Sequence, residues 1–208
     1  MKQLVIIGAG NVGGYLSYNI DSFGDYEVLG FLDDDHHKHG RTLYGRRVLG
    51  GINEIEILSK TEKLEVVIGI SSPIAKQKMY HRLKAFNVIF PNFIAKNVWL
   101  SNQVTIGKGV ILYPGVSINY ETKIEDFVIM NMNCAIGHNC TIGQYSTLAP
   151  GVNLAGFTHL EAMVSVGIGV STKQNVKVGH SSNIAGQSML IKDVEPNTTV
   201  GGVPAKVL

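Results

Sequence analysis

Apolar residues recur at every sixth position over the second half of the chain. From Ile94 to Leu190, every residue in this series is apolar except Thr172. A second series of smaller residues follows four positions later, and no insertion breaks either count. A period of six fits neither the 3.6-residue turn of an α-helix nor the two-residue alternation of a strand. It is typical of a β-solenoid, whose short strands send large side chains inward and whose corners take small ones.

Residues 1–92 follow a different pattern, in which apolar runs alternate with polar and glycine-containing segments. Residues 4–7 and 28–32 read as buried strands, and residues 12–23 between them as a helix. Further on, the pattern predicts a strand at 64–70, a helix at 73–85 and a short strand at 88–91. The polar segment 36–51 is predicted to be a solvated loop. Four strands are fewer than the six of a full dinucleotide-binding domain, so the domain suits a mononucleotide or a nucleotide-linked molecule.

A glycine-rich turn follows the first predicted strand. Gly8, Gly10 and Gly13 match the pattern G-x-G-x-x-G, and Asp33 stands 20 residues after Gly13. Such glycines allow a tight turn and a close backbone approach to phosphate at a helix N-terminus, while the acid binds a ribose. The alternative is a tight turn in an α/β domain that binds no ligand.

Composition and charge narrow the class of protein. Eighteen basic residues against 16 acidic ones leave a net charge of +2, which does not indicate a nucleic-acid or membrane-surface binder. The N-terminus lacks a signal-peptide pattern and no apolar run is long enough to span a membrane, so we expect a cytoplasmic protein. Cys134 and Cys140 both occupy small corner positions, which favours two buried thiols over a disulfide or a metal site.

Three features together resemble one group of enzymes. They are the Rossmann-like N-terminal pattern ending in Phe31-Leu32-Asp33-Asp34, the stretch from Ile136 to Gly143 that contains His138, and the tail Gly201-Gly202-Val203-Pro204-Ala205-Lys206. Along the whole chain they resemble the NeuD/PglD group of sugar acetyltransferases, which belong to the hexapeptide-repeat acyltransferases. The resemblance implies an α/β domain at residues 1–92 and a left-handed parallel β-helix with a C-terminal tail at residues 93–208.

The resemblance also implies a function. The protein would be a cytoplasmic homotrimer that transfers acetyl from acetyl-CoA to a UDP-4-amino-4,6-dideoxy sugar, for bacterial surface glycan synthesis. Each active site would lie between neighbouring β-helices, and no metal is expected. The implied site residues are His138 as general base with Asn139 beside it, Thr147, Gly156, Ile168 and Gly186 along acetyl-CoA, and Gly10, Asn11, Val12, Asp33 and Asp34 at the nucleotide-sugar.

The six-residue count supports this placement. His138 is two residues past the inward Ile136, so its side chain should point outward, and Gly156 lies one coil of 18 residues further on, where it leaves space beside the histidine. Ile168 and Gly186 are also 18 apart and should stack. The chain departs from the group at Asn139, where an acidic residue is usual, and at Thr147 and Val12, where histidines are frequent.

Three other functions stay open. A sugar O-acetyltransferase, of the kind that acts on sialic acid, would share the fold but not the nucleotide. The glycine pattern with Asp33 is also compatible with an NAD-binding protein. Finally, the β-helix could serve as a trimeric scaffold without catalysis.

Overall fold

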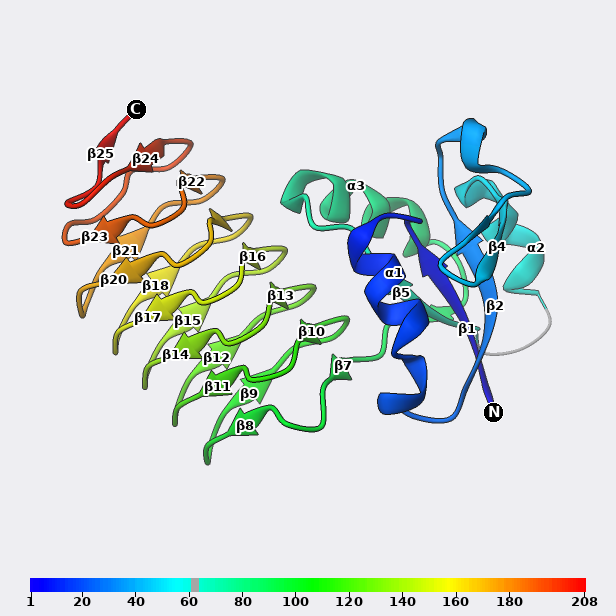
Figure 1. The fold of residues 1–208 in the computed structure, drawn as a ribbon, viewed down its shortest axis with the longest axis horizontal. Coiled ribbons are helices and arrows are strands. Elements are labelled where there is room, and N and C mark those ends of the chain that lie inside the picture. The colour runs from blue at the N-terminus through cyan, green and yellow to red at the C-terminus, as the bar shows by residue number, and fades with distance from the viewer. Residues whose placement is uncertain (61–63) are drawn as a thin grey trace. The chain divides into compact units, whose positions relative to one another are not determined.

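The computed structural model describes residues 1–60 and 64–208, which fold into two units (Figure 1). Unit 1 contains Met1–Ser71 and Ala75–Pro91, and unit 2 contains Ser72–Ile74 and Asn92–Leu208. We call them the N-terminal domain and the β-helix domain. Within the described ranges, every helix is too short or too polar to cross a membrane.

The N-terminal domain contains one six-stranded sheet in the order β3-β4-β2-β1-β5-β6. All neighbouring strands are parallel except the antiparallel pair β3 and β4. The strands are β1 (Lys2–Ile7), β2 (Tyr26–Leu32), β3 (Thr42–Leu43), β4 (Arg46–Gly50), β5 (Leu64–Ile68) and β6 (Val88–Ile89). The helices are α1 (Asn11–Tyr18), α2 (Ile55–Leu58) and α3 (Pro73–Leu83), with 3-10 turns at Ile20–Ser22, His36–Lys38 and Ile52–Glu54. The strands and helices predicted from the apolar runs are thus all present, with α1 shorter than expected.

The prediction of a solvated loop at residues 36–51 is wrong. Most of this segment forms the hairpin of β3 and β4, and β4 joins the sheet beside β2. Tyr44 and Gly45 both have positive φ, 48° and 75°, the backbone that a tight two-residue hairpin turn requires. Val48 is fully buried while Arg47 and Leu49 are exposed, so the strand has one apolar position facing the core. With so few apolar residues, the segment carried little periodic signal.

Three glycines bring the start of α1 close to the sheet. Gly8 has a φ of +94°, which a side chain disfavours. A Cβ on Gly13 would lie 2.0 Å from the carbonyl oxygen of Gly8, and a Cβ on Gly69 would lie 2.9 Å from the Cα of Gly13. Side chains at these positions would therefore push the helix off the ends of β1 and β5.

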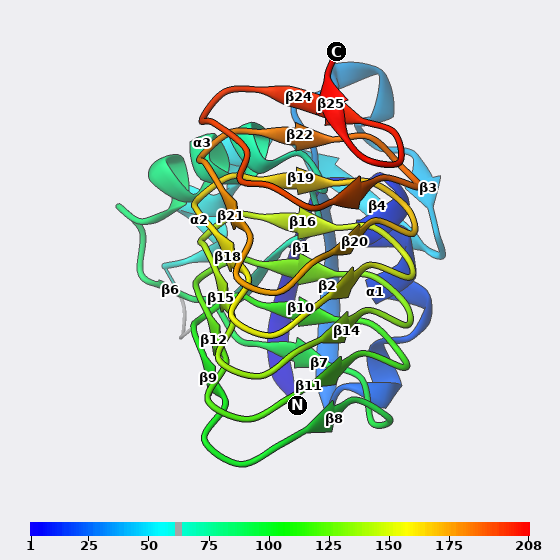
Figure 2. The same cartoon turned by 90° about the vertical axis from the view of Figure 1, so that its left-hand side faces the viewer.

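The β-helix domain is a left-handed parallel β-helix with three sheets of very short strands (Figure 2). Paired residues are 18 apart, as in Ile118 with Ile136, so each coil takes three hexads. Sheet I contains β7 (Phe93–Ile94), β10 (Ile111–Leu112), β13 (Ile129–Met130), β16 (Thr147–Leu148), β19 (Ser165–Val166), β22 (Asn183–Ile184), β24 (Thr199–Gly201) and β25 (Lys206–Val207). Sheet II contains β8 (Trp99–Leu100), β11 (Ser117–Ile118), β14 (Ala135–Ile136), β17 (Asn153–Leu154), β20 (Ser171–Thr172) and β23 (Met189–Leu190). Sheet III contains β9 (Thr105–Ile106), β12 (Lys123–Ile124), β15 (Thr141–Ile142), β18 (His159–Leu160) and β21 (Lys177–Val178). This confirms the predicted fold class.

The corners between the sheets repeat one backbone conformation. Every sixth residue from Gln103 to Gln187 has a positive φ, although most of these residues are not glycine. The left-handed conformation costs most residues free energy, and Asn is among the few that adopt it readily. The apolar count did not reveal this feature, because it depends on the turn residues and not on the inward ones.

The inward series fills the interior as predicted. From Leu112 to Leu190 its members are buried, whereas Leu100 in the first coil is exposed. Cys134 and Cys140 are free, buried thiols, and burial raises the pKa of the Cys134 thiol to about 11. Thr172, the polar member of the series, bonds to the preceding coil. Its hydroxyl accepts from the amide of Ala155 at 3.0 Å and lies 2.9 Å from the hydroxyl of Thr158.

Candidate active site

A cavity of about 390 Å³ opens in the N-terminal domain at the carboxyl ends of β1, β2 and β5. The chain leaves β1 for β2 on one side and later returns to β5 on the other, so the strand order reverses beside β1. Open α/β sheets bind ligands at this reversal point. The cavity is lined by Ile7, Gly8, Gly10, Asn11, Val12, Leu32, Asp33, Asp34, Lys38, Ile52, Gly69, Ile70, Ser71 and Met79.

All five residues predicted to contact the nucleotide-sugar line this cavity: Gly10, Asn11, Val12, Asp33 and Asp34. A Cβ built on Gly10 would meet no atom within 4 Å, and the residue is the N-cap of α1 with a φ of −115°. Neither packing nor backbone conformation therefore requires glycine at this position. Because Gly10 has no side chain, the N-terminus of α1 is open, and its free backbone amides can bind an anion there.

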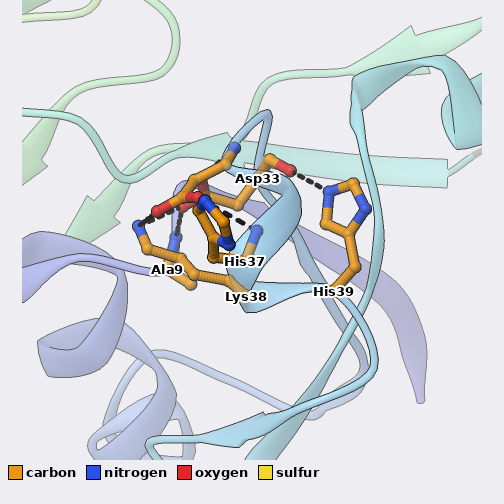
Figure 3. Close-up of polar contacts among 6 residues, drawn as sticks. Ala9, Asp33, His37, Lys38 and His39 are labelled. Atoms are coloured by element: carbon orange, nitrogen blue, oxygen red, sulfur yellow. Dashed lines mark hydrogen bonds and ion pairs between the residues drawn. The ribbon is translucent and has the colours of Figure 1, made fainter.

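Asp33 organises the loops around the cavity (Figure 3). One of its oxygens accepts from the amide of Ala9 at 2.8 Å and from Lys38 Nζ at 2.9 Å, and the other accepts from the amide of Asp35 at 2.9 Å. His39 Nε2 donates to the carbonyl of Asp33 at 2.7 Å. Burial would raise the pKa of Asp33, but these bonds from Lys38 and the amides outweigh it and lower the pKa. The carboxylate of Asp33 is thus engaged in hydrogen bonds within the protein, whereas the sequence pattern predicted that it would bind a ribose.

Asp34 also holds protein groups. One oxygen accepts from the amide of Ile52 at 3.2 Å, and the other pairs with the guanidinium of Arg82 on α3. Arg82 donates in addition to the side chain of Asn53 at 3.4 Å. Asp34 therefore ties the end of β2 to α3 at the edge of the cavity.

Lys38 is a cavity residue that the sequence reasoning missed. Its charged Nζ lies within the set of groups around Asp33, while the neighbouring His36, His37 and His39 are exposed. In the sequence, Lys38 stands five residues after Asp33, inside the segment predicted to be a solvated loop. Among the described residues, the ligand atoms of Asp35, His36 and His37 lie within 4.8 Å of one another, all on the exposed surface.

In the β-helix domain, His138 lies at the corner between sheets II and III, outside the core and partly buried. Its ring stacks on Tyr120 with centroids 5.1 Å apart and meets Phe157 edge-on at 5.0 Å. Tyr120 is 18 residues earlier, in the equivalent position of the preceding coil. Two aromatic rings therefore hold the imidazole in one orientation on an otherwise outward-facing corner.

A hydrogen-bonded chain runs from the ring of His138. Its Nδ1 lies 2.9 Å from Asn139 Oδ1, and Asn139 Nδ2 donates to Glu121 Oε2 at 2.6 Å. Glu121 was not identified from the sequence. It stands 18 residues before Asn139, directly below it in the preceding coil.

The other ring nitrogen faces the space above Gly156, as the register predicted. A Cβ on Gly156 would lie 2.7 Å from His138 Nε2, and the φ of Gly156 is not in the left-handed range. Glycine at position 156 thus avoids a clash with the imidazole, and its absent side chain leaves space beside Nε2.

The residues implied for acetyl-CoA lie in separate places on one chain. Ile168 and Gly186 stack at the corner between sheets I and II, and a Cβ on Gly186 would contact the backbone of Ile168 at 3.3 Å. Thr147 lies on sheet I in β16. His138 and Gly156 occupy the next corner, on the far side of sheet II, so the stack of Ile168 and Gly186 is not beside His138 within one chain.

A Rossmann-like domain with a cavity at its strand ends, followed by a left-handed β-helix with an outward histidine, defines a two-domain hexapeptide-repeat protein. Residues 3–83 match the family model described as the PglD N-terminal domain. None of the curated proteins compared with the chain matches it.

Solved structures share the fold over the whole chain. The acetyltransferase domain of PglB from Neisseria gonorrhoeae is 21% identical, with 100% of both chains covered and a TM-score of 0.90. PerB from Caulobacter crescentus, solved with CoA and GDP-perosamine, is 24% identical, with 100% of this chain and 98% of that chain covered and a TM-score of 0.93. WeeI from Acinetobacter baumannii is 25% identical over 100% of both chains, with a TM-score of 0.88. The resemblance seen in the sequence is therefore confirmed.

Proposed function

We propose that the protein is an acetyl-CoA-dependent N-acetyltransferase that acts on a nucleotide-linked amino sugar, with His138 as the general base. The observation that carries the proposal is the geometry of His138, whose Nδ1 is engaged by Asn139 while Nε2 faces the open space over Gly156. Histidine is the side chain best suited to take a proton near neutral pH. PerB, which shares the fold, is named a perosamine N-acetyltransferase and has also been solved as histidine-to-asparagine and histidine-to-alanine variants with both ligands.

The reaction follows from these groups. The neutral amine of the sugar attacks the thioester carbonyl carbon of acetyl-CoA and forms the C–N bond. The nitrogen passes one proton to His138 Nε2, the C–S bond breaks, and the thiolate of CoA leaves, taking up the proton from the imidazolium. Backbone amides at the corners could stabilise the oxyanion as it develops.

The acceptor's nucleotide binds the cavity of the N-terminal domain in this proposal. Gly10, Asn11 and Val12 offer the first turn of α1 to the diphosphate, and Lys38 adds a positive charge. Asp33 and Asp34 shape the cavity by holding its loops, so their part in binding is largely indirect. The resemblance to the NeuD/PglD group implies a UDP-4-amino-4,6-dideoxy sugar from bacterial surface glycan synthesis. PerB was solved with a GDP-linked sugar, so the test includes both nucleotides.

We further propose that the working form is a cytoplasmic homotrimer, with acetyl-CoA held between neighbouring β-helices. Two columns of stacked corner residues support this: one contains His138 and Gly156, and the other contains Ile168 and Gly186. Ile168 and Gly186 lie at one corner of a chain and His138 at the next. In a three-fold assembly, a different corner of each neighbour can face His138. Thr147, Gly156, Ile168 and Gly186 are then the residues proposed to line acetyl-CoA.

The function is tested by incubating the purified protein with acetyl-CoA and UDP-, GDP- or dTDP-linked 4-amino sugars and following the release of free CoA. We expect turnover with at least one acceptor. The substitution His138→Ala should lower kcat by about 10²- to 10⁴-fold, the usual contribution of a general base, and leave the melting temperature within a few degrees. Absence of CoA release across the panel would contradict an N-acetyltransferase of this class.

A further inference from the structure

Glu121 is placed to act on His138 through an intervening side chain. It lies at the left-handed position of the corner one coil before Asn139, with a φ of 54°, and its side chain is exposed except for the contact with Asn139. Asn139 Nδ2 donates to Glu121 Oε2 across a separation of 2.6 Å, so the amide and the carboxylate are in direct contact.

The carboxylate determines which way the amide of Asn139 points. An ionised carboxylate only accepts hydrogen bonds, so the NH₂ of Asn139 must face Glu121 and its Oδ1 must face His138. Oδ1 in turn only accepts, so the neutral imidazole must carry its proton on Nδ1. Nε2 is then the nitrogen with the free lone pair, and it is the one over Gly156.

We infer that Glu121 is a positioning residue for the reaction, acting through Asn139 to hold His138 in the tautomer with a basic Nε2. This inference rests on the proposed function for its catalytic consequence, but the tautomer itself does not. When His138 takes the proton, the carboxylate of Glu121 also favours the imidazolium from across the amide. The pair of Asn139 and Glu121 thus does what a single acid next to the histidine would do, with the charge displaced by one side chain.

The tautomer can be read without turnover. In the full chain labelled with ¹⁵N-histidine, the nitrogen shifts and ¹H–¹⁵N couplings of His138, assigned with His138→Ala, should show the proton on Nδ1. Glu121→Ala leaves the amide free to turn, so it should add a population protonated on Nε2. A wild-type protein protonated mainly on Nε2, or an unchanged spectrum in Glu121→Ala, would overturn the inference even if the enzyme were active.

The kinetic test uses a matched control and a charge exchange. Glu121→Gln keeps the size of the side chain and removes its charge. It should lower kcat about 10-fold, a smaller fall than that expected for His138→Ala, with little change in KM for acetyl-CoA or for the nucleotide-sugar. The control is Glu161→Gln. Glu161 also accepts from the next coil, at the amide of His180 and at Lys177, but it belongs to another corner and should leave kcat unchanged.

The exchange distinguishes a role in positioning from one in folding. Asn139→Asp alone sets two carboxylates against each other and should lower kcat strongly. Adding Glu121→Gln lets the new amide donate to the aspartate, which now bonds His138 directly, so the double variant should recover most of the activity. Failure of this rescue, or equal kcat in Glu121→Gln and Glu161→Gln, would refute the role of Glu121. An inactive wild type with the expected tautomer would refute only the proposed function.

Discussion

A single missing side chain determines whether His138 is accessible. Gly156→Ala would place a Cβ 2.7 Å from Nε2, and the ring cannot turn away easily because Tyr120 and Phe157 pack against it. Since displacing a reacting group by about 1 Å costs on the order of 10²-fold in rate, we expect a similar fall in kcat, measured by CoA release.

The matched control for Gly156→Ala is Gly186→Ala. Its Cβ would approach only the backbone of Ile168 at 3.3 Å, so a small adjustment accommodates it. We expect this variant to raise KM for acetyl-CoA and to keep kcat. Equal kcat values in the two variants would mean that the space above His138 is not used in the reaction.

Asp33 makes a second residue-scale prediction, on stability against pH. Its folded pKa is lowered from 3.8 by bonds from Lys38 and the amides of Asp35 and Ala9, which together outweigh the opposite effect of burial. The stabilisation is therefore present above the unfolded pKa and is lost as pH falls through the lower folded value. We expect Asp33→Asn to melt below wild type at pH 7 and the gap to close below about pH 4. A gap that stays constant in melting curves from pH 2 to 7 would contradict this.

Gly13 and Gly10, both at the start of α1, differ in how much they matter for stability. Gly13→Ala would place a Cβ 2.0 Å from the carbonyl of Gly8, a clash with backbone that cannot relax without moving the helix. Overpacking costs about 3 kcal/mol and each 1 kcal/mol lowers Tm by ~2–4 °C in a chain of this size, so we expect a fall of about 10 °C. Gly10→Ala meets no atom within 4 Å and should melt like wild type.

Although Gly10→Ala should leave the melting temperature unchanged, we expect it to weaken nucleotide binding. Because Gly10 lines the cavity, its added Cβ should weaken binding of the accepted nucleotide about 10-fold in calorimetry, by blocking close approach to the amides of α1. A Gly10→Ala variant that binds normally would place the diphosphate elsewhere in the cavity.

At the scale of elements, the sequence predicted those parts of the fold whose constraint is local and repeated. Each coil needs a large inward residue every six positions, so the count alone located the strands from Phe93 to Leu190. The hairpin at 42–50 was missed because its turn is Tyr44-Gly45 and only Val48 is a buried apolar residue in it. The left-handed corners were missed because side chains as different as Phe157 and Asn139 occupy them.

The same register explains how far the site could be predicted. Stepping 18 residues forward from His138 led to Gly156, a prediction that the structure confirms in its geometry. Stepping 18 residues back from Asn139 leads to Glu121, so the signal was present in the sequence. Only the structure shows that these two side chains meet. The bonds that occupy Asp33 could not be predicted, because they depend on the fold of the loop that contains Lys38.

At the scale of the whole molecule, the separation of the two β-helix columns predicts a site shared between chains. His138 lies at the corner between sheets II and III, while Ile168 and Gly186 stack between sheets I and II. If acetyl-CoA bound to the second column of one chain reaches His138 of its neighbour, two inactive variants can complement each other. His138→Ala supplies an intact acetyl-CoA column, and Gly186→Trp, which fills that column, supplies an intact histidine.

The two variants, each with a different affinity tag, are unfolded together in equal amounts, refolded, and purified through both tags. Purification through both tags keeps only trimers that contain both variants. In each such trimer about one of the three two-chain sites has an intact half from each variant, so roughly a third of wild-type activity should return. A site built within one chain would recover none, because every chain carries a defect. Wild-type protein taken through the same unfolding controls for losses on refolding, and separately refolded variants mixed afterwards should remain inactive unless the chains exchange.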